Sequence, residues 1–196
     1  EPDGPARAGR DDDLTLRQAA RTRSFWILVA MLAVFFGVFV GVLDHLVSAM
    51  RDRGMDRTRA SDWFGLIGLV GAFSKVGFGA LADWIDHRKA MWLQSGLFAA
   101  STAALFFVPS PGITPVAIAV FGVATASRDV VYPLIIGYCF GQRYLAEIYG
   151  VLMGALWVGA VGTIWGGSVF DRTGSYDAMF QVFAGVAVLG FVAVLF

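Results

Sequence analysis

The chain alternates six long apolar segments with short polar connections. The apolar segments are residues 24–47, 62–82, 90–108, 113–140, 148–170 and 178–196. Each is close to the roughly 20 residues that an α-helix needs to cross a hydrocarbon core about 30 Å thick. They are apolar around the whole helix, whereas a surface helix of a soluble protein is apolar on one side only. They also lack the alternation of transmembrane strands. The pattern predicts an all-α membrane protein with six transmembrane helices.

Composition narrows the possible functions. Hydrophobic residues make up 57% of the chain and charged residues 15%, against about 25% charged residues in a soluble domain. The formal net charge is zero, which argues against nucleic acid as a partner. A single cysteine and two distant histidines provide neither a disulfide framework nor a recognisable metal site. No segment pairs a nucleophile with a base. We therefore expect no catalytic residues, no metal and no cofactor, and the lipid bilayer as the main surroundings.

The two ends and the distribution of positive charge suggest how the chain lies in the membrane. Residues 1–23 are polar, mix acids with arginines and show no apolar periodicity, which predicts a linker. The chain begins with Glu and stops inside an apolar segment, so we expect a piece of a longer protein; a trimmed amino terminus is the alternative. Lys and Arg favour the cytoplasmic side, and placing the linker there puts eight of them on that side and five opposite. We expect a multi-pass protein of the cell membrane with this amino terminus in the cytoplasm.

A weak internal repeat relates the first three segments to the last three. The second and fifth segments both end in the pattern Gly-x-x-x-Asp, at 79–83 and 167–171, and Gly71 and Gly159 share the same offset of 88 residues. Chance recurrence of common glycines is the alternative. The units are residues 24–108 and 113–196. Because three helices is an odd number, the two units must be inverted in the membrane, as in many secondary transporters.

Three stretches resemble a known family. Residues 79–89, GALADWIDHRK, are similar to the loop signature of the major facilitator superfamily, with Trp84 and Asp86 departing from it. Residues 140–150 and 170–176 resemble the branch of monocarboxylate transporters and oxalate/formate antiporters. The resemblance covers about residues 14–196. It implies the carboxy-terminal six-helix half of a twelve-helix transporter, in which a missing amino-terminal half of the same chain forms the other wall of the cavity.

The resemblance also implies a function. It is secondary active transport of a small organic anion, a monocarboxylate or dicarboxylate, by alternating access, as an antiporter or as a symporter with a co-transported proton. A facilitator for another small solute, or a facilitator-type membrane sensor or scaffold that no longer transports, remains the alternative. The signature further implies a gating latch at the cytoplasmic end, formed by Gly79, Asp83, Arg88 and Lys89. An ordinary solvated loop would contain the same residue types.

Charged residues inside the apolar segments are the strongest candidates for a site. Each costs about 2.5–3.5 kcal/mol at the centre of a membrane helix. Arg128 and Asp129 lie near the middle of the fourth segment, so we expect them to face protein or an aqueous cavity. Lys75 shares a helix face with Gly68 and Gly71, and small residues indicate a face packed against another helix. In the resemblance, Lys75 takes the place of a basic residue that pairs with substrate.

These residues predict a substrate site in which Lys75 and Arg128 hold a carboxylate. Asp129 accompanies them, Tyr132 lies one helical turn beyond Arg128, and Trp157 of the fifth segment is a further candidate for the cavity wall. The structural alternatives are an Arg128–Asp129 ion pair that only fixes helix packing, an inter-helix salt bridge of Lys75, and a packing role for Trp157.

Overall fold

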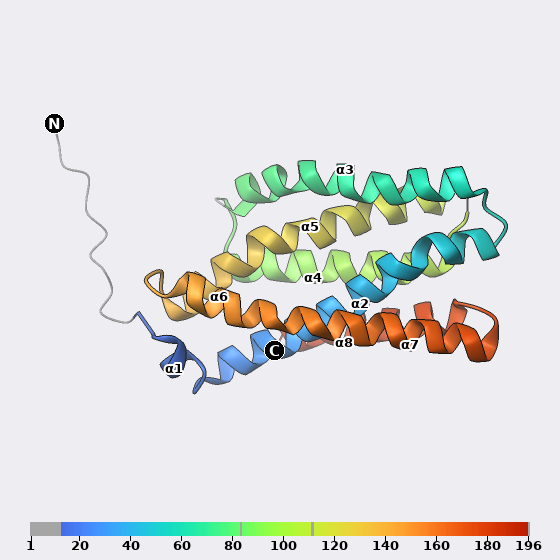
Figure 1. The fold of residues 1–196 in the computed structure, drawn as a ribbon. Coiled ribbons are helices and arrows are strands. Elements are labelled where there is room, and N and C mark those ends of the chain that lie inside the picture. Colours follow the sequence, from blue (N-terminus) through green and yellow to red (C-terminus); the bar gives the residue numbers. More distant parts are fainter. Residues whose placement is uncertain (1–12, 83, 111, 196) are drawn as a thin grey trace.

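The computed structural model describes residues 13–82, 84–110 and 112–195. Figure 1 shows that this part of the chain forms a bundle of helices joined by short connections. The α-helices are α1 (Leu16–Ala19), α2 (Arg23–Asp52), α3 (Arg57–Ala82), α4 (His87–Ala104), α5 (Ile113–Phe140), α6 (Leu145–Met153), α7 (Trp157–Thr173) and α8 (Asp177–Leu195). A 3-10 turn, Leu105–Phe107, extends α4, and another, Gly154–Leu156, joins α6 and α7 into one span. In the described ranges, six helices are long and apolar enough to cross a membrane, which confirms the predicted fold class.

The helices run past the ends of the apolar segments because polar residues cap and extend them. Thr22 accepts a hydrogen bond from the backbone N–H of Phe25 at 3.2 Å, at the start of α2. Asp86 accepts one from the N–H of Arg88 at 2.8 Å, at the start of α4. These bonds satisfy N–H groups that the first turn of a helix leaves unpaired. Hydropathy therefore locates each helix, whereas its ends depend on these local bonds.

The helices of the first three spans and those of the last three make equivalent packing contacts, as the predicted repeat requires. α3 packs against α5, and α2 packs in the same way against α7; α4 contacts α5, and α8 contacts α2; α4 and α8 pack against each other. Exchanging the first three spans with the last three leaves this pattern unchanged. In Figure 1, α2 and α5 run in opposite directions, as do α3 and α7. The two three-helix units are therefore inverted relative to each other.

The glycines of the repeat make equivalent contacts. A Cβ atom on Gly71 would lie 3.4 Å from the carbonyl oxygen of Gly122 and 3.1 Å from the Cβ of Ala126, both on α5. A Cβ atom on Gly159 would lie 3.4 Å from the carbonyl oxygen of Phe36 and 2.9 Å from the Cβ of Val40, both on α2. The two partners on α2 and the two on α5 differ by the same 86 residues. The glycines thus bring α3 onto α5 and α7 onto α2 in one shared geometry.

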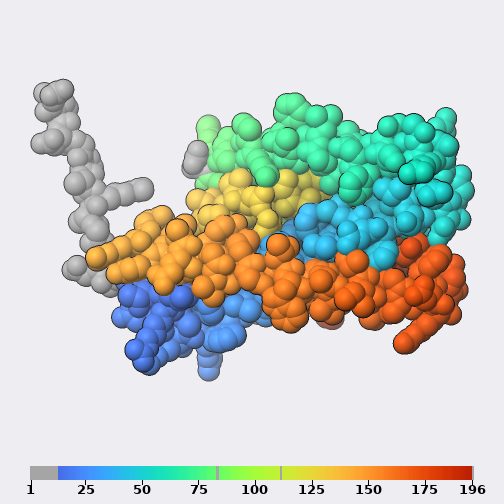
Figure 2. All heavy atoms as spheres, viewed as in Figure 1, coloured from blue at the N-terminus to red at the C-terminus, as the bar shows by residue number. Residues whose placement is uncertain are grey.

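The described part of the bundle has two layers. α2, α3, α5 and the α6–α7 span form the face seen in Figure 2, and α4 and α8 lie mostly behind it. Aromatic rings fill the space between the layers: Phe98 of α4 lies 4.6 Å from Phe35 of α2 and 5.9 Å from Phe121 of α5, measured between ring centroids. This packed back leaves the polar groups described below on the side of α2, α3 and α5.

The segment before α2 is fastened to the bundle. The N–H of Leu14 donates to the carbonyl oxygen of Phe140 at 2.9 Å, and the N–H of Gln142 donates to the Asp13 carboxylate at 3.1 Å. Gly141, at the end of α5, has φ = +88°, and a side chain there would collide with Asp13. Residues 13–23 of the predicted linker therefore contain the helical turn α1 and a fixed contact with the end of α5. Residues 1–12 lie outside the described residues.

Candidate functional site

A cavity of about 740 Å³ lies between α2, α3 and α5. On α3, Gly65, Gly68 and Gly71 line it, and a Cβ atom on Gly65 or Gly68 would meet nothing within 4 Å. Phe39 of α2 and Phe64 of α3 contribute aromatic rings to its wall. The three charged residues that the sequence analysis placed inside the membrane are Lys75, Arg128 and Asp129, and all three line this cavity.

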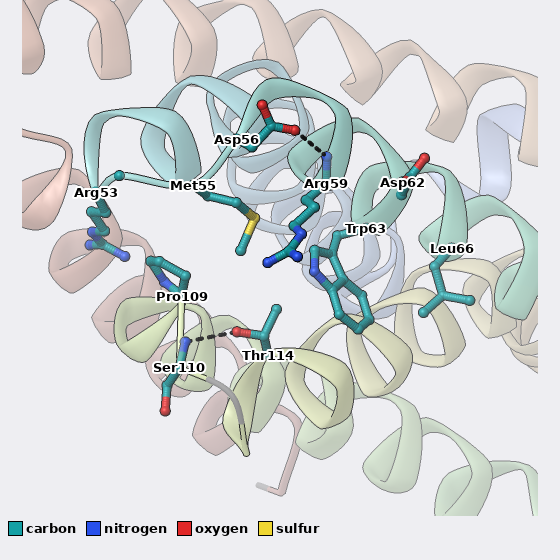
Figure 3. Close-up of a pocket in the computed structure, with 11 residues that line it drawn as sticks. Arg53, Met55, Asp56, Arg59, Asp62, Trp63, Leu66, Pro109, Ser110 and Thr114 are labelled. Atoms are coloured by element: carbon teal, nitrogen blue, oxygen red, sulfur yellow. Dashed lines mark hydrogen bonds between the residues drawn. The ribbon is translucent and has the colours of Figure 1, made fainter.

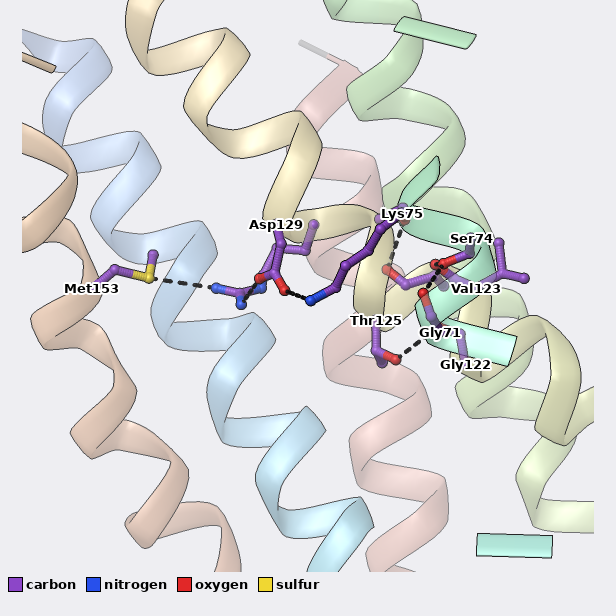
Figure 4. Close-up of polar contacts among 11 residues, drawn as sticks. Gly71, Ser74, Lys75, Gly122, Val123, Thr125, Asp129 and Met153 are labelled. Carbon is purple, nitrogen blue, oxygen red and sulfur yellow. Dashed lines mark hydrogen bonds and ion pairs between the residues drawn. The ribbon is translucent and has the colours of Figure 1, made fainter. Parts of the chain in front are cut away.

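The three charges form one connected group, here called the charged triad. The Lys75 Nζ atom of α3 lies 2.7 Å from Asp129 Oδ2 of α5. The Arg128 Nη2 atom donates to the other oxygen, Asp129 Oδ1. Figure 4 shows Asp129 facing the end of the Lys75 side chain, which reaches across from α3. One carboxylate therefore holds two cations from two different helices, and the triad has a formal charge of +1.

The members of the triad differ in how accessible they are. The Lys75 side chain is 50% exposed and that of Asp129 35%, but that of Arg128 only 13%. The Arg128 guanidinium lies over the rings of Phe36 and Phe35, 4.8 Å and 5.4 Å from their centroids. Such cation–π contacts stabilise a guanidinium that has lost its water. Arg128 is therefore held in place, whereas Lys75 is open to the cavity.

Close contact between α3 and α5 sets the position of the triad. A Cβ atom on Gly122 would lie 2.8 Å from the carbonyl oxygen of Ile67, so the two backbones meet directly. About two turns further along α3, the Ser74 hydroxyl lies 2.9 Å from the Gly71 carbonyl oxygen and 3.4 Å from that of Val123 on α5. Lys75 follows Ser74, which brings it to the level of Asp129 (Figure 4).

Tyr132 and Trp157, the other predicted substrate contacts, are not among the residues that line this cavity. Tyr132 is 2% exposed and lines a separate cavity of about 30 Å³ together with Phe35 and Gln94. Trp157 is 70% exposed on α7. The structure thus brings Lys75, Arg128 and Asp129 together and leaves the other two apart from them.

The residues of the predicted latch lie where α3 ends and α4 begins. Gly79 is in the last turn of α3, where a Cβ atom would meet nothing within 4 Å, while Arg88 and Lys89 are exposed in the first turn of α4. Asp83 lies outside the described residues. The α4 amino terminus is capped by Asp86, one of the two residues that depart from the signature. The latch itself stays a prediction.

A second cavity, of about 760 Å³, lies at the other end of the bundle, where α2 leads into α3 (Figure 3). Two arginines and two aspartates line it: Arg53, Arg59, Asp56 and Asp62. In Figure 3 the Arg59 side chain points into the cavity. The two cavities are similar in volume, but these four charges cancel, whereas those of the triad leave one positive charge. The triad cavity is therefore the better candidate for an anion.

Arg53, at the end of α2, contacts both the α4–α5 connection and the start of α8. Its guanidinium donates to the carbonyl oxygen of Val108, in the α4–α5 connection, and pairs with the Asp177 carboxylate of α8 at 2.5 Å. It also lies 5.3 Å from the ring centroid of Phe180. Arg53 thereby links the end of α2 to both units of the repeat.

Two aromatic residues of the site were not singled out from the sequence. Phe35 and Phe36 seat the guanidinium of Arg128, and they come from α2, which is apolar over nearly its whole length. Nothing in such a segment distinguishes a ring that packs under a cation from one that packs in the core. The available signal was indirect: an arginine inside a membrane segment needs partners, and aromatic rings are among the groups that can supply them.

Comparison with known proteins relates the chain, including the charged triad, to one protein family. The family model described as Major Facilitator Superfamily matches residues 1–142, nearly three quarters of the chain. The match ends just after α5, so it includes every member of the charged triad. A search of curated proteins finds no significant match.

Proposed function

Because this chain belongs to the major facilitator superfamily, a family of membrane transporters, we propose that it carries a small organic anion across the membrane by alternating access. The observation that supports an anion is the charged triad, which leaves one positive charge in a cavity of about 740 Å³. A charge inside a membrane protein is costly and marks a functional site by default.

The geometry of the triad explains how it would recognise a carboxylate. Lys75 and Arg128 already converge on one carboxylate, that of Asp129. A substrate carboxylate is the same chemical group and can compete for the same two cations. Lys75 is half exposed and makes the first contact in this proposal, because its flexible ammonium can leave Asp129 without moving a helix. Away from water, the attraction between these charges is several-fold stronger than in bulk solvent.

In this proposal the chain forms the carboxy-terminal half of the transporter, and a preceding six-helix half supplies the other wall of the cavity. Rocking of the two halves would expose the triad first to one side of the membrane and then to the other. A sensor or scaffold that has lost transport would be expected to fill such a cavity with bulky side chains. Gly65 and Gly68 of α3 leave space there instead, which favours transport.

Uptake by the full-length protein in proteoliposomes tests this proposal. Radiolabelled monocarboxylates and dicarboxylates are offered under an inward gradient, and Lys75→Gln and Arg128→Gln should each abolish uptake at unchanged protein levels. Lys75→Arg should be tolerated better than Arg128→Lys, because Lys acts as a point charge whereas Arg has a planar fork. Arg172→Gln, which removes an exposed arginine from the end of α7, is the matched control and should transport normally.

Two results would contradict parts of the proposal. Normal carboxylate uptake by Lys75→Gln would remove the anion site from this cavity. Full activity of the double variant Arg128→Gln with Asp129→Asn would show that these two residues form a structural ion pair, and that Arg128 does not contact the substrate.

A further inference from the structure

We propose that Asp129 determines which anions the site accepts: it cancels one of the two cationic charges and so selects monoanions over dianions. This inference rests on the proposed function. It adds a charge rule for the substrate and assigns it to one residue.

The contacts of Asp129 support a permanent role as an internal counter-charge. Both of its carboxylate oxygens are used, one by Lys75 and one by Arg128. Arg128 cannot easily leave, because its guanidinium is 13% exposed, lies over Phe36 and donates to the Met153 sulfur at 3.5 Å. When Lys75 turns to a substrate, Arg128 keeps its contact with Asp129 through one N–H group, and its guanidinium has further donors for the substrate. Asp129 therefore still cancels one of the two positive charges, and the site offers a net charge of +1.

One positive charge matches one negative charge. A bound monocarboxylate makes the cavity neutral, whereas a dicarboxylate leaves one negative charge without compensation. In surroundings that exclude water, such an unpaired charge is strongly disfavoured. The charge balance therefore discriminates between the two classes before their shapes are compared.

The rest of the cavity wall supports the same choice. Apart from the triad, the described residues that line it are apolar or glycine, with the exception of Thr125. The Thr125 hydroxyl already donates to the carbonyl oxygen of Phe121 at 2.8 Å. A second carboxylate would therefore face rings such as Phe39 and Phe64, whereas the hydrocarbon part of a monocarboxylate packs well against them.

Competing uptake of two acids of equal carbon number tests this rule. Propionate is a monoanion, and malonate is mainly a dianion at slightly alkaline pH. Full-length wild-type protein in proteoliposomes should prefer propionate by roughly tenfold or more. Asp129→Asn raises the triad from +1 to +2 and should shift the ratio toward malonate by a similar factor. Asp129→Glu keeps the charge and is the matched control, so its ratio should stay close to that of the wild type.

A second variant tests the charge rule even if Asp129→Asn does not fold. Asp129→Asn leaves Arg128 buried without its partner, which can prevent folding. Arg128→Gln combined with Asp129→Asn removes both charges and returns the site to +1, so any uptake that it retains should keep the wild-type preference for propionate. A wild-type protein that prefers malonate overturns the rule, as does an unchanged ratio in Asp129→Asn or a malonate preference in the double variant. Each of these results requires carboxylate uptake and so leaves the proposed function standing. A wild type that carries neither this pair of acids nor any other carboxylate refutes the proposed function as well.

Discussion

Adding one methyl group at Gly162 should weaken the contact between α2 and α7. A Cβ atom at this position would collide with the carbonyl oxygen of Gly37 and would lie 2.9 Å from its carbonyl carbon and 3.3 Å from its Cα. All three atoms belong to the α2 backbone, which cannot rotate aside as a side chain can. Accommodating the Gly162→Ala variant therefore requires the two helices to move apart.

The size of the effect follows from two opposing contributions. Overpacking of a tight contact costs about 1–3 kcal/mol, and the upper half of that range applies because backbone is the obstacle. Replacing Gly by Ala within a helix returns about 1 kcal/mol. We therefore expect a net loss of about 1–2 kcal/mol in the free energy of unfolding. For a chain of this length, each kcal/mol corresponds to about 2–4 °C in Tm.

Gly150 provides the matched control within the same membrane span. A Cβ atom there would meet nothing within 4 Å, so Gly150→Ala keeps the gain in helix propensity without the collision. Thermal unfolding of the purified variants in detergent should lower the Tm for Gly162→Ala and leave it unchanged or raised for Gly150→Ala. Equal Tm values for the two variants would refute the argument that backbone contact at Gly162 holds α2 and α7 together.

Three further predictions concern topology, completeness and the connections at the Arg53 end. In a Cys139→Ser background, cysteines at Ser110 and Ser175 should react with impermeant thiol reagents from outside the cell, and one at Gln142 only after permeabilisation; the reverse pattern would invert the proposed orientation. The chain expressed alone should remain membrane-bound but show no saturable uptake in vesicles, because a cavity between two halves would have one wall only; such uptake by the monomeric chain would contradict it. Arg53→Gln should lower stability by about 1 kcal/mol through the loss of a charged donor to a carbonyl and a partly exposed ion pair; an unchanged Tm would show that the linked connections do not stabilise the bundle.

The sequence predicted the six spans because the membrane imposes a length that few other folds share. The observed helices exceed the apolar segments mainly at polar ends, as where α2 continues beyond residue 47 to Asp52. Hydropathy has no information about such turns, which depend on local hydrogen bonds. The inverted repeat was visible in three pairs of positions only, yet the contacts of Gly71 and Gly159 show that the structural repeat is closer than the sequence repeat.

The ion pair between Lys75 and Asp129 illustrates what a sequence cannot provide. An inter-helix salt bridge of Lys75 was one of the alternatives, but its partner was unknown, because the 53 intervening residues say nothing about the register of two helices. The contact of Gly71 with Ala126 fixes that register. Lys75 and Asp129 then lie about one turn further along α3 and α5 respectively. Tyr132, one more turn along α5, is buried away from the cavity.

The segment before α2 is hydrogen-bonded to the far end of α5, so these two parts of the chain are directly coupled. Leu14 and Asp13 are bonded at the end of α5, to Phe140 and to Gln142 beyond it. Phe140 and Arg128 are 12 residues apart on that helix, a distance of about 18 Å at the usual rise per residue. A displacement of Asp13 and Leu14 would therefore act directly on the end of α5, the helix that carries Arg128 and Asp129.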